Sequence, residues 1–298
     1  MSSVTQKLCN KKLCSPPKWL PSNLHYEVWM GSVAYGVNQD NSDLDIYGFC
    51  IPPKEDVFPY LRGEILGFGN QKKRFDQYQQ HHIIDQQARG GKGQEYDLTI
   101  YSIVKYFQLV MENNPNMIDS LYVPNDCVLH ITTIGQMVRD NRDLFLHKGS
   151  WHKFRGYAYS QLSKIKGKTK ESKRWESIEK YGYDVKFAYH TVRLVLEVEQ
   201  ILTENTIDLR RNAELLKVIR NGEWTEQRIR DWFTAKEKAL EPLYHSSDLQ
   251  YKPDENKIKE LLLNCLEQHY GSLSSAIVKP NSTQNLVNEI ESVLERYK

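Results

Sequence analysis

Two short segments of this 298-residue chain carry residue types that suit metal-assisted chemistry on phosphates. The first is a turn of small residues, Gly31-Ser32, and ten residues separate it from the first of two carboxylates, Asp43 and Asp45. A glycine lets the backbone approach a polyphosphate closely, and a serine hydroxyl beside free backbone N–H groups can bind its oxygens. The candidate phosphate-binding residues of the two segments are Gly31, Ser32, Gly36 and Ser42.

The two aspartates occupy alternate positions at the start of an expected strand, residues 44–51. Because side chains alternate between the faces of a strand, Asp43 and Asp45 should project to one side, with Cα atoms about 6 to 7 Å apart. Such carboxylates can share two Mg²⁺ or Mn²⁺ ions, which stabilise the attacking and leaving oxygens of an in-line displacement. The third carboxylate that such a site needs is assigned to Asp97, with Glu95 as the alternative on the same face.

The elements that must position these residues can be placed approximately. Short strand-like runs with Gly, Pro and Asn between them fill the first half of the chain, and we expect strands at residues 27–30, 44–51, 75–84 and 95–98. Thr99 is expected to cap the helix that follows the last strand, and Asn113-Asn114-Pro115 to end it. From about Trp151 onward the pattern is mainly helical.

The second half holds a basic and aromatic segment. Residues 151–200 contain 11 basic and 6 acidic residues, a local net charge of +5, with several tyrosines and a tryptophan close by. Basic side chains can hold a phosphate backbone while exposed rings stack on unpaired bases, although a flexible basic loop explains the composition equally well. The candidate acceptor-binding residues are Lys164, Lys166, Lys168, Lys173 and Arg174.

An expected helix over residues 184–202 carries three cationic positions. Lys186, His190 and Arg193 follow the spacing i, i+4, i+7 and therefore share one face. If that face turns toward the catalytic cleft, it binds a triphosphate or the acceptor's phosphates; the alternative is a solvated helix face. Neighbouring His81 and His82 are interpreted as structural or surface residues, because adjacent positions on a strand point to opposite faces. Arg220 is interpreted as ordinary helix-end chemistry.

Composition bounds the remaining possibilities. The 40 basic and 38 acidic residues leave a formal charge of +2, so any nucleic-acid binding must come from local patches. No run of about 18 apolar residues occurs, and the polar start does not resemble a signal peptide. Five cysteines without zinc-ligand spacing suit reduced thiols. The sequence therefore predicts a soluble cytoplasmic protein without a membrane partner.

The motifs of this chain resemble those of a known family. Gly31-Ser32, ten intervening residues and Asp43-Leu44-Asp45 resemble the motif of the DNA polymerase β-like nucleotidyltransferase superfamily. The longer strings 31–38 and 42–48 resemble a bacterial and phage branch of predicted nucleotidyltransferases associated with RNA repair. The resemblance covers about residues 26–224, and the later segments that agree with this branch are 96–103, 114–115, 118–121, 155–161 and 183–190.

The resemblance implies an α+β fold, with a small mixed-sheet catalytic domain over residues 1–148 and a mainly helical substrate-binding domain over residues 149–298. It implies Asp43, Asp45 and Asp97 as ligands of two Mg²⁺ or Mn²⁺ ions, with an NTP as substrate. The expected reaction moves a nucleoside monophosphate to a hydroxyl, at an RNA 3′ end such as that of tRNA. The alternatives are nucleotidylation of a protein side chain and a non-catalytic nucleotide- or RNA-binding module.

Overall fold

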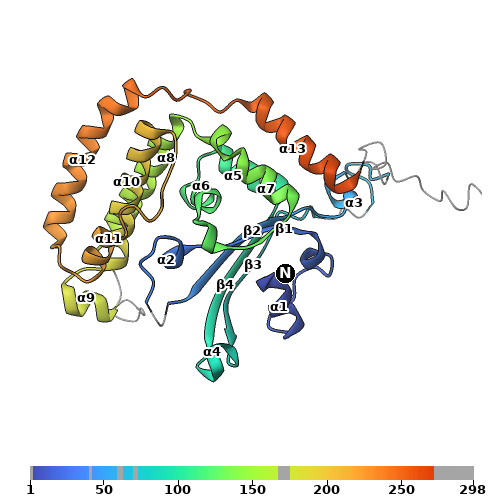
Figure 1. Cartoon of the computed structure of the whole chain (residues 1–298), viewed down its shortest axis with the longest axis horizontal. Helices are drawn as coiled ribbons and strands as arrows, with labels where there is room; N and C mark the ends of the chain where they lie inside the picture. Colours follow the sequence, from blue (N-terminus) through green and yellow to red (C-terminus); the bar gives the residue numbers. More distant parts are fainter. Residues whose placement is uncertain (1–2, 40–41, 59–62, 70–72, 167–174, 272–298) are drawn as a thin grey trace, which may run out of the picture.

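A single mixed sheet organises the first half of the chain (Figure 1). The computed structural model describes residues 3–39, 42–58, 63–69, 73–166 and 175–271. The strands lie in the order β3-β4-β2-β1-β5, in which β2 and β4 are parallel and the other neighbours antiparallel. Their bounds are β1 Leu24–Trp29, β2 Leu44–Cys50, β3 Gln77–Asp85, β4 Gln94–Ser102 and β5 Val128–Ile131.

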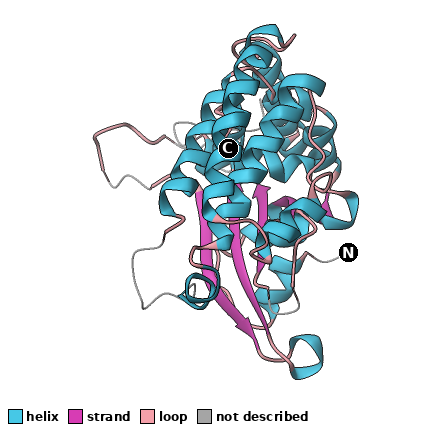
Figure 2. Cartoon of the chain, turned by 90° about the vertical axis from the view of Figure 1, so that its left-hand side faces the viewer, coloured by secondary structure: helices cyan, strands magenta, loops and turns pink. Residues whose placement is uncertain are grey.

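Both faces of the sheet are covered, because its strands carry apolar side chains on each side. Ile46, Leu98 and Ile100 are buried on one face together with Leu8 and Leu20 from the N-terminal segment. The opposite core includes buried residues of β1, β2 and the helices that follow β4. Figure 2 shows the strands beneath a thick layer of helices. Burial on both faces holds the strand register rigid, which is the requirement for a precise site.

Short helices and turns connect the strands. The N-terminal helix is anchored by the buried carboxylate of Glu27 on β1, which accepts hydrogen bonds from the backbone N–H of Val4 (2.6 Å) and of Thr5 (2.8 Å). The helical segments of this half are α1 Val4–Asn10, η1 Leu20–Asn23, α2 Gly31–Ala34, α3 Lys54–Val57, α4 Ala88–Gly91, α5 Ile103–Met111, α6 Pro115–Tyr122, η3 Asn125–Cys127, α7 Thr133–Asp140 and η4 Arg142–Phe145.

The end of β4 differs from expectation. Thr99 does not cap α5, because it is paired with Tyr47 in the parallel ladder and the strand continues to Ser102. The Ser102 hydroxyl accepts the backbone N–H of Lys105 and is the N-cap. A β-branched residue such as Thr fits a buried strand as well as a cap, and the strand pairing decides between the two.

The second half consists of helices around a long central one. The helix expected over residues 184–202 is α10, which packs against α8, α11 and α12. Its N-cap is Asp184, whose carboxylate accepts the backbone N–H groups of Lys186 (2.9 Å) and Phe187 (3.2 Å). The helices among the described residues of this half are α8 Gly149–Lys164, α9 Trp175–Tyr181, α10 Val185–Glu204, α11 Ala213–Arg220, α12 Glu226–Ser246 and α13 Glu255–Tyr270.

Helix α13 returns to the first half of the chain, where it contacts α5 and α7 (Figure 1). One hydrophobic core includes both Tyr26 of β1 and Leu266 of α13. The α+β class is confirmed, and the division at residue 148 stays a prediction. In the part of the chain that the structure describes, no helix is both long and apolar enough to cross a membrane.

Candidate active site

The turn after β1 is shaped by a glycine that no other residue can replace without strain. Gly31 has a φ of +60°, and a Cβ on it would lie 1.9 Å from Oδ2 of Asp45. The backbone N–H of Met30 donates to the Asp45 carbonyl (2.8 Å), which ties the turn to β2. Gly31 therefore lies directly beside the carboxylate of Asp45, and Ser32 lines the same pocket as that carboxylate.

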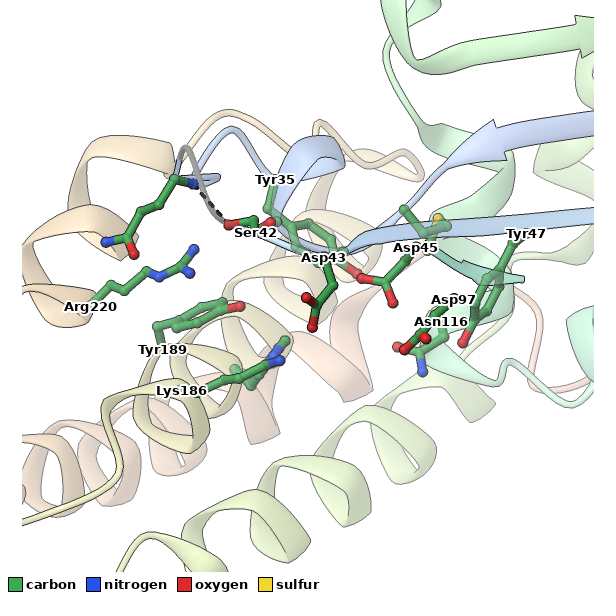
Figure 3. Close-up of a pocket in the computed structure, with 15 residues that line it drawn as sticks. Tyr35, Ser42, Asp43, Asp45, Tyr47, Asp97, Asn116, Lys186, Tyr189 and Arg220 are labelled. Atoms are coloured by element: carbon green, nitrogen blue, oxygen red, sulfur yellow. Dashed lines mark hydrogen bonds between the residues drawn. The ribbon is translucent and has the colours of Figure 1, made fainter. Parts of the chain in front are cut away.

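Parallel pairing of β2 and β4 brings the carboxylates together. Asp45 is in register with Asp97, so both project from the same face of the sheet, and Asp43 immediately precedes β2. All three line one open pocket with a volume of about 400 Å³ (Figure 3). We call Asp43, Asp45 and Asp97 the pocket carboxylates. Their convergence depends on residues 52 positions apart in the sequence, and the strand register alone produces it.

The carboxylates of the pocket are close enough to influence one another's titration. Burial, and to a smaller extent the negative charges of Asp97 and Asp43, raise the pKa of Asp45 to about 6, although Lys186 opposes the rise. Three carboxylates forced together favour the binding of divalent cations, because oxygen ligands suit Mg²⁺ and each cation relieves their mutual repulsion. The donor set therefore fits the metal ions that the polymerase β resemblance implies.

The helical half forms the opposite wall of the pocket. Lys186 and His190 of α10 line it, as the helix pattern predicts, and Tyr189 lies between them. Arg220 at the end of α11 also lines it, and its guanidinium carbon lies 5.6 Å from the centre of the Tyr189 ring. Figure 3 shows Lys186, Tyr189 and Arg220 on the side facing Asp43. The pocket thus places acidic groups on the sheet opposite cationic and aromatic groups on the helices.

Sequence reasoning missed several lining residues. The sequence pattern places Arg220 at an ordinary helix end. In the structure its side chain donates to the carbonyl of Val37 and so joins α11 to the segment after α2. Asn116 lies in the first turn of α6, directly after Pro115 at the helix start, and that Pro-Asn pair was the available signal. The pocket residues outside the predicted set are Met30, Tyr35, Gln39, Tyr47, Asn116, Tyr189 and Arg220.

The loop between α2 and β2 is held in part by Ser42. The Ser42 hydroxyl accepts the backbone N–H of Gln39 (2.9 Å), and both residues line the pocket (Figure 3). Gly36 has a different place from the one expected. Its φ is +68°, and a Cβ on it would contact Ala213 and Arg210 rather than the pocket. Gly36 therefore serves the packing of the turn against the start of α11.

Arg193 requires a correction. It shares the helix face of Lys186 and His190, but its side chain is only 4% exposed and is paired with the buried carboxylates of Asp119 and Glu197. The guanidinium carbon lies 4.1 Å from the ring centre of Tyr35, whose hydroxyl donates to Asp119 (2.8 Å). Tyr35 lines the pocket, so Arg193 lies behind the pocket wall. We call Arg193, Asp119 and Glu197 the Arg193 cluster.

The candidate acceptor-binding residues are only partly placed. Lys164 ends α8 and Lys166 follows it; both are exposed, and neither belongs to the pocket lining. Lys168, Lys173 and Arg174 lie outside the described residues. Exposed aromatic side chains do occur nearby on α8, at Tyr157 and Tyr159.

The chain is similar to several known proteins over much of its length. Residues 9–270 match the model of the family described as RNA repair pathway DNA polymerase beta family. An uncharacterized 38.9 kDa protein of Enterobacteria phage T4, from the nrdC-mobD intergenic region, is 24% identical over 143 residues. That match covers 47% of this chain and only 38% of the phage protein. A nucleotidyltransferase-like protein from Exiguobacterium sibiricum matches at 10% identity and a TM-score of 0.28, over 81% of this chain and 73% of that one.

Proposed function

This chain belongs to the RNA repair pathway DNA polymerase beta family, and from that premise we propose that it is a nucleotidyltransferase. It transfers a nucleoside monophosphate from an NTP to an acceptor hydroxyl. The acceptor oxygen forms a bond to the α-phosphorus, the bond from that phosphorus to the bridging oxygen breaks, and pyrophosphate leaves. The observation that carries the proposal is the alignment of Asp45 with Asp97, beside the Gly31-Ser32 turn.

The sheet side and the helical side of the pocket have different roles in the proposed reaction. Asp43 and Asp45 would hold the cation that accompanies the NTP, and Asp97 would hold a cation next to the acceptor hydroxyl. Such ions neutralise charge on the reacting phosphate and lower the pKa of the attacking hydroxyl. The backbone at Gly31 and the hydroxyl of Ser32 bind phosphate oxygens.

The helical wall positions the NTP. Lys186 faces the pocket carboxylates closely enough to oppose the rise in the pKa of Asp45, so it is placed to neutralise the polyphosphate next to them. His190 and Arg220 extend the cationic wall, and Arg220 is fixed by its bond to the Val37 carbonyl. Orientation of the triphosphate by fixed groups is the main contribution a protein makes to phosphoryl transfer.

The proposed acceptor is the 3′ end of an RNA. Tyr157 on α8 is 38% exposed and accepts a hydrogen bond from Asn114 (3.1 Å), two residues before Asn116 of the pocket. Exposed Tyr159 and the basic end of α8 continue from there. Rings and cations in this arrangement suit an unpaired strand, since stacking and phosphate contacts together bind single-stranded nucleic acid. The family description supports the same acceptor.

The acceptor can be tested directly by following a labelled nucleotide. The protein is incubated with each α-labelled NTP, with Mg²⁺ or Mn²⁺, and with either cellular RNA or RNA whose 3′ diol has been oxidised by periodate. We expect label in intact RNA and none in oxidised RNA. Asp248→Asn, an exposed carboxylate outside the pocket, serves as the control variant and should label RNA like the wild type. Label that enters a protein fraction instead, or equal labelling of oxidised RNA, would overturn the RNA 3′ end as acceptor.

A further inference from the structure

A group of metal-ligand side chains lies at the edge of the sheet, next to the pocket. Nδ1 or Nε2 of His82 and one carboxylate oxygen each of Glu95 and Asp97 lie within 4.8 Å of one another. His82 belongs to the edge strand β3, and the two acids belong to its neighbour β4. Asp43 and Asp45 are not part of this group, so it differs in composition from the pocket carboxylates.

A β-bulge creates the cluster. The pairing of β3 with β4 shifts between Gln80, opposite Leu98, and Ile83, opposite Tyr96. Two residues, His81 and His82, therefore stand against the single residue Asp97, which is the defining feature of a bulge. The expectation that the two histidines point to opposite faces is wrong at this position, because His82 adopts a φ of +55° and leaves the regular alternation.

The bulge turns both imidazoles toward carboxylates. Nδ1 of His81 lies 3.3 Å from Oδ2 of Asp97, and Nδ1 of His82 contacts Oε1 of Glu95. The backbone N–H of His82 donates to Oδ1 of Asp97 (2.8 Å), which fixes the bulge to the acid. The donor set is thus the imidazole of His82 and two carboxylates. Nε2 of His81 instead lies 2.7 Å from Nε2 of Gln79.

This donor set selects a different metal from the pocket carboxylates. Imidazole is a common ligand of Zn²⁺, Co²⁺ and other transition ions, whereas Mg²⁺ prefers oxygen ligands alone. The side chains of Glu95 and Asp97 are 24% exposed and that of His82 is 68% exposed, so water can complete the coordination. A mixed site open to solvent on one side suits a single exchangeable divalent ion.

We propose that His82, Glu95 and Asp97 bind one divalent transition-metal ion at the edge of the sheet. We call this the edge site. It depends on the proposed function only through Asp97, which it shares with the pocket carboxylates. Occupation of the edge site would therefore act on the acceptor side of the pocket through that carboxylate.

The test measures metal binding and needs no catalytic activity. Wild-type protein in excess Mg²⁺, without nucleotide, is titrated with Co²⁺ while the visible ligand-field absorption of the bound ion is followed. We expect one Co²⁺ per chain. The variant His82→Gly should bind it at least about tenfold more weakly, because it loses a nitrogen ligand. Glycine readily adopts the positive φ of this position, so the variant should unfold at the same temperature or higher.

Two matched variants separate the edge site from the pocket. His152→Ala removes an exposed imidazole on α8 and should leave Co²⁺ binding unchanged. Asp43→Asn removes a pocket carboxylate and should also leave it unchanged, although the proposed function requires it to lose nucleotidyl transfer. Absence of Co²⁺ binding by the wild type, equal binding by folded His82→Gly, or loss of binding in Asp43→Asn would each overturn the edge site. A protein that binds Co²⁺ as expected but transfers no nucleotide would refute the proposed function alone.

Discussion

Two groups of acids lie on either side of Tyr35, and they are built in opposite ways. In the Arg193 cluster, two fully enclosed carboxylates surround one guanidinium, and Tyr35 donates a further hydrogen bond. The pocket carboxylates converge on an open cavity that Lys186 faces from the other wall. The first arrangement pairs its charges with one another inside the protein, whereas the second is suited to cations and phosphates from solution.

The contrast between the two groups shows that the spacing of cationic residues on a helix does not by itself locate a ligand site. Lys186 and Arg193 lie seven residues apart on one face of α10. Lys186 is exposed in the pocket, but Arg193 is enclosed because α6 brings Asp119 against it. The partner supplied by another element decides whether the cation serves stability or binding.

Replacing the cation that faces each group of acids, Arg193 in one and Lys186 in the other, should produce the largest contrast in stability. Arg193→Met leaves two buried carboxylates without their counter-charge, so we expect the free energy of unfolding to fall by about 3–5 kcal/mol at neutral pH. Lys186→Met, on the same helix face, should change it by no more than about 0.5 kcal/mol. Denaturant unfolding followed by circular dichroism measures both. Similar losses in the two variants would show that the groups are not built differently.

A pair of glycines tests how tightly the turn approaches the pocket carboxylates. Gly31 and Gly36 both have positive φ, so an alanine at either position should cost about 1–2 kcal/mol of stability. Only at Gly31 does the new Cβ collide with Oδ2 of Asp45; at Gly36 it makes ordinary contacts with Ala213. We expect Gly31→Ala to lower kcat/KM for NTP at least about 100-fold more than Gly36→Ala. Equal loss of nucleotidyl transfer in the two variants would show that the Gly31-Ser32 turn is not part of the active site.

The smallest predicted effect concerns the pH dependence of the Arg193 cluster. Burial raises the pKa of Glu197 well above its ordinary value, and burial likewise raises that of Asp119, although Arg193 opposes both rises. A carboxyl with a raised folded-state pKa contributes stability below its unfolded pKa and loses that contribution as the pH rises. Glutamine keeps an acceptor oxygen for Arg193 and carries no charge. Glu197→Gln should therefore match the wild type near pH 4 and equal or exceed its stability at pH 8.

Thermal unfolding of Glu197→Gln and wild type across that range measures the difference. A variant that is less stable than the wild type by a margin that widens toward pH 8 would mean that the Glu197 charge stabilises the cluster. The two acidic groups would then resemble one another more closely than their surroundings indicate.

Local pattern was sufficient to predict the strands on the sheet side of the pocket. The alternation around Asp43 and Asp45 and the apolar run after Glu95 depend on neighbours in sequence, so the strands that carry the acids could be recognised. Asp97 was preferred to Glu95 because it ends an expected strand just before a helix, and the pairing that places it beside Asp45 comes only from the parallel register of β2 and β4. Glu95 instead contacts the imidazole of His82.

The features that could not be predicted depend on contacts between distant segments. Arg193 pairs with Asp119, 74 residues away, and Arg220 reaches the carbonyl of Val37, 183 residues away. The β3 bulge reverses the expected direction of His82, because one inserted residue disrupts the alternation of the whole strand. No spacing rule within a single helix or strand contains this information.

The central claim is that the pocket carboxylates catalyse nucleotidyl transfer. The most direct measurement is the rate of pyrophosphate release from NTP, with Mg²⁺ and RNA present, by wild type and Asp43→Asn. We expect a rate at least about 100-fold lower for the variant, since a cation ligand is lost, with an unchanged unfolding temperature because Asp43 is exposed. A folded Asp43→Asn protein that releases pyrophosphate at close to the wild-type rate would contradict it.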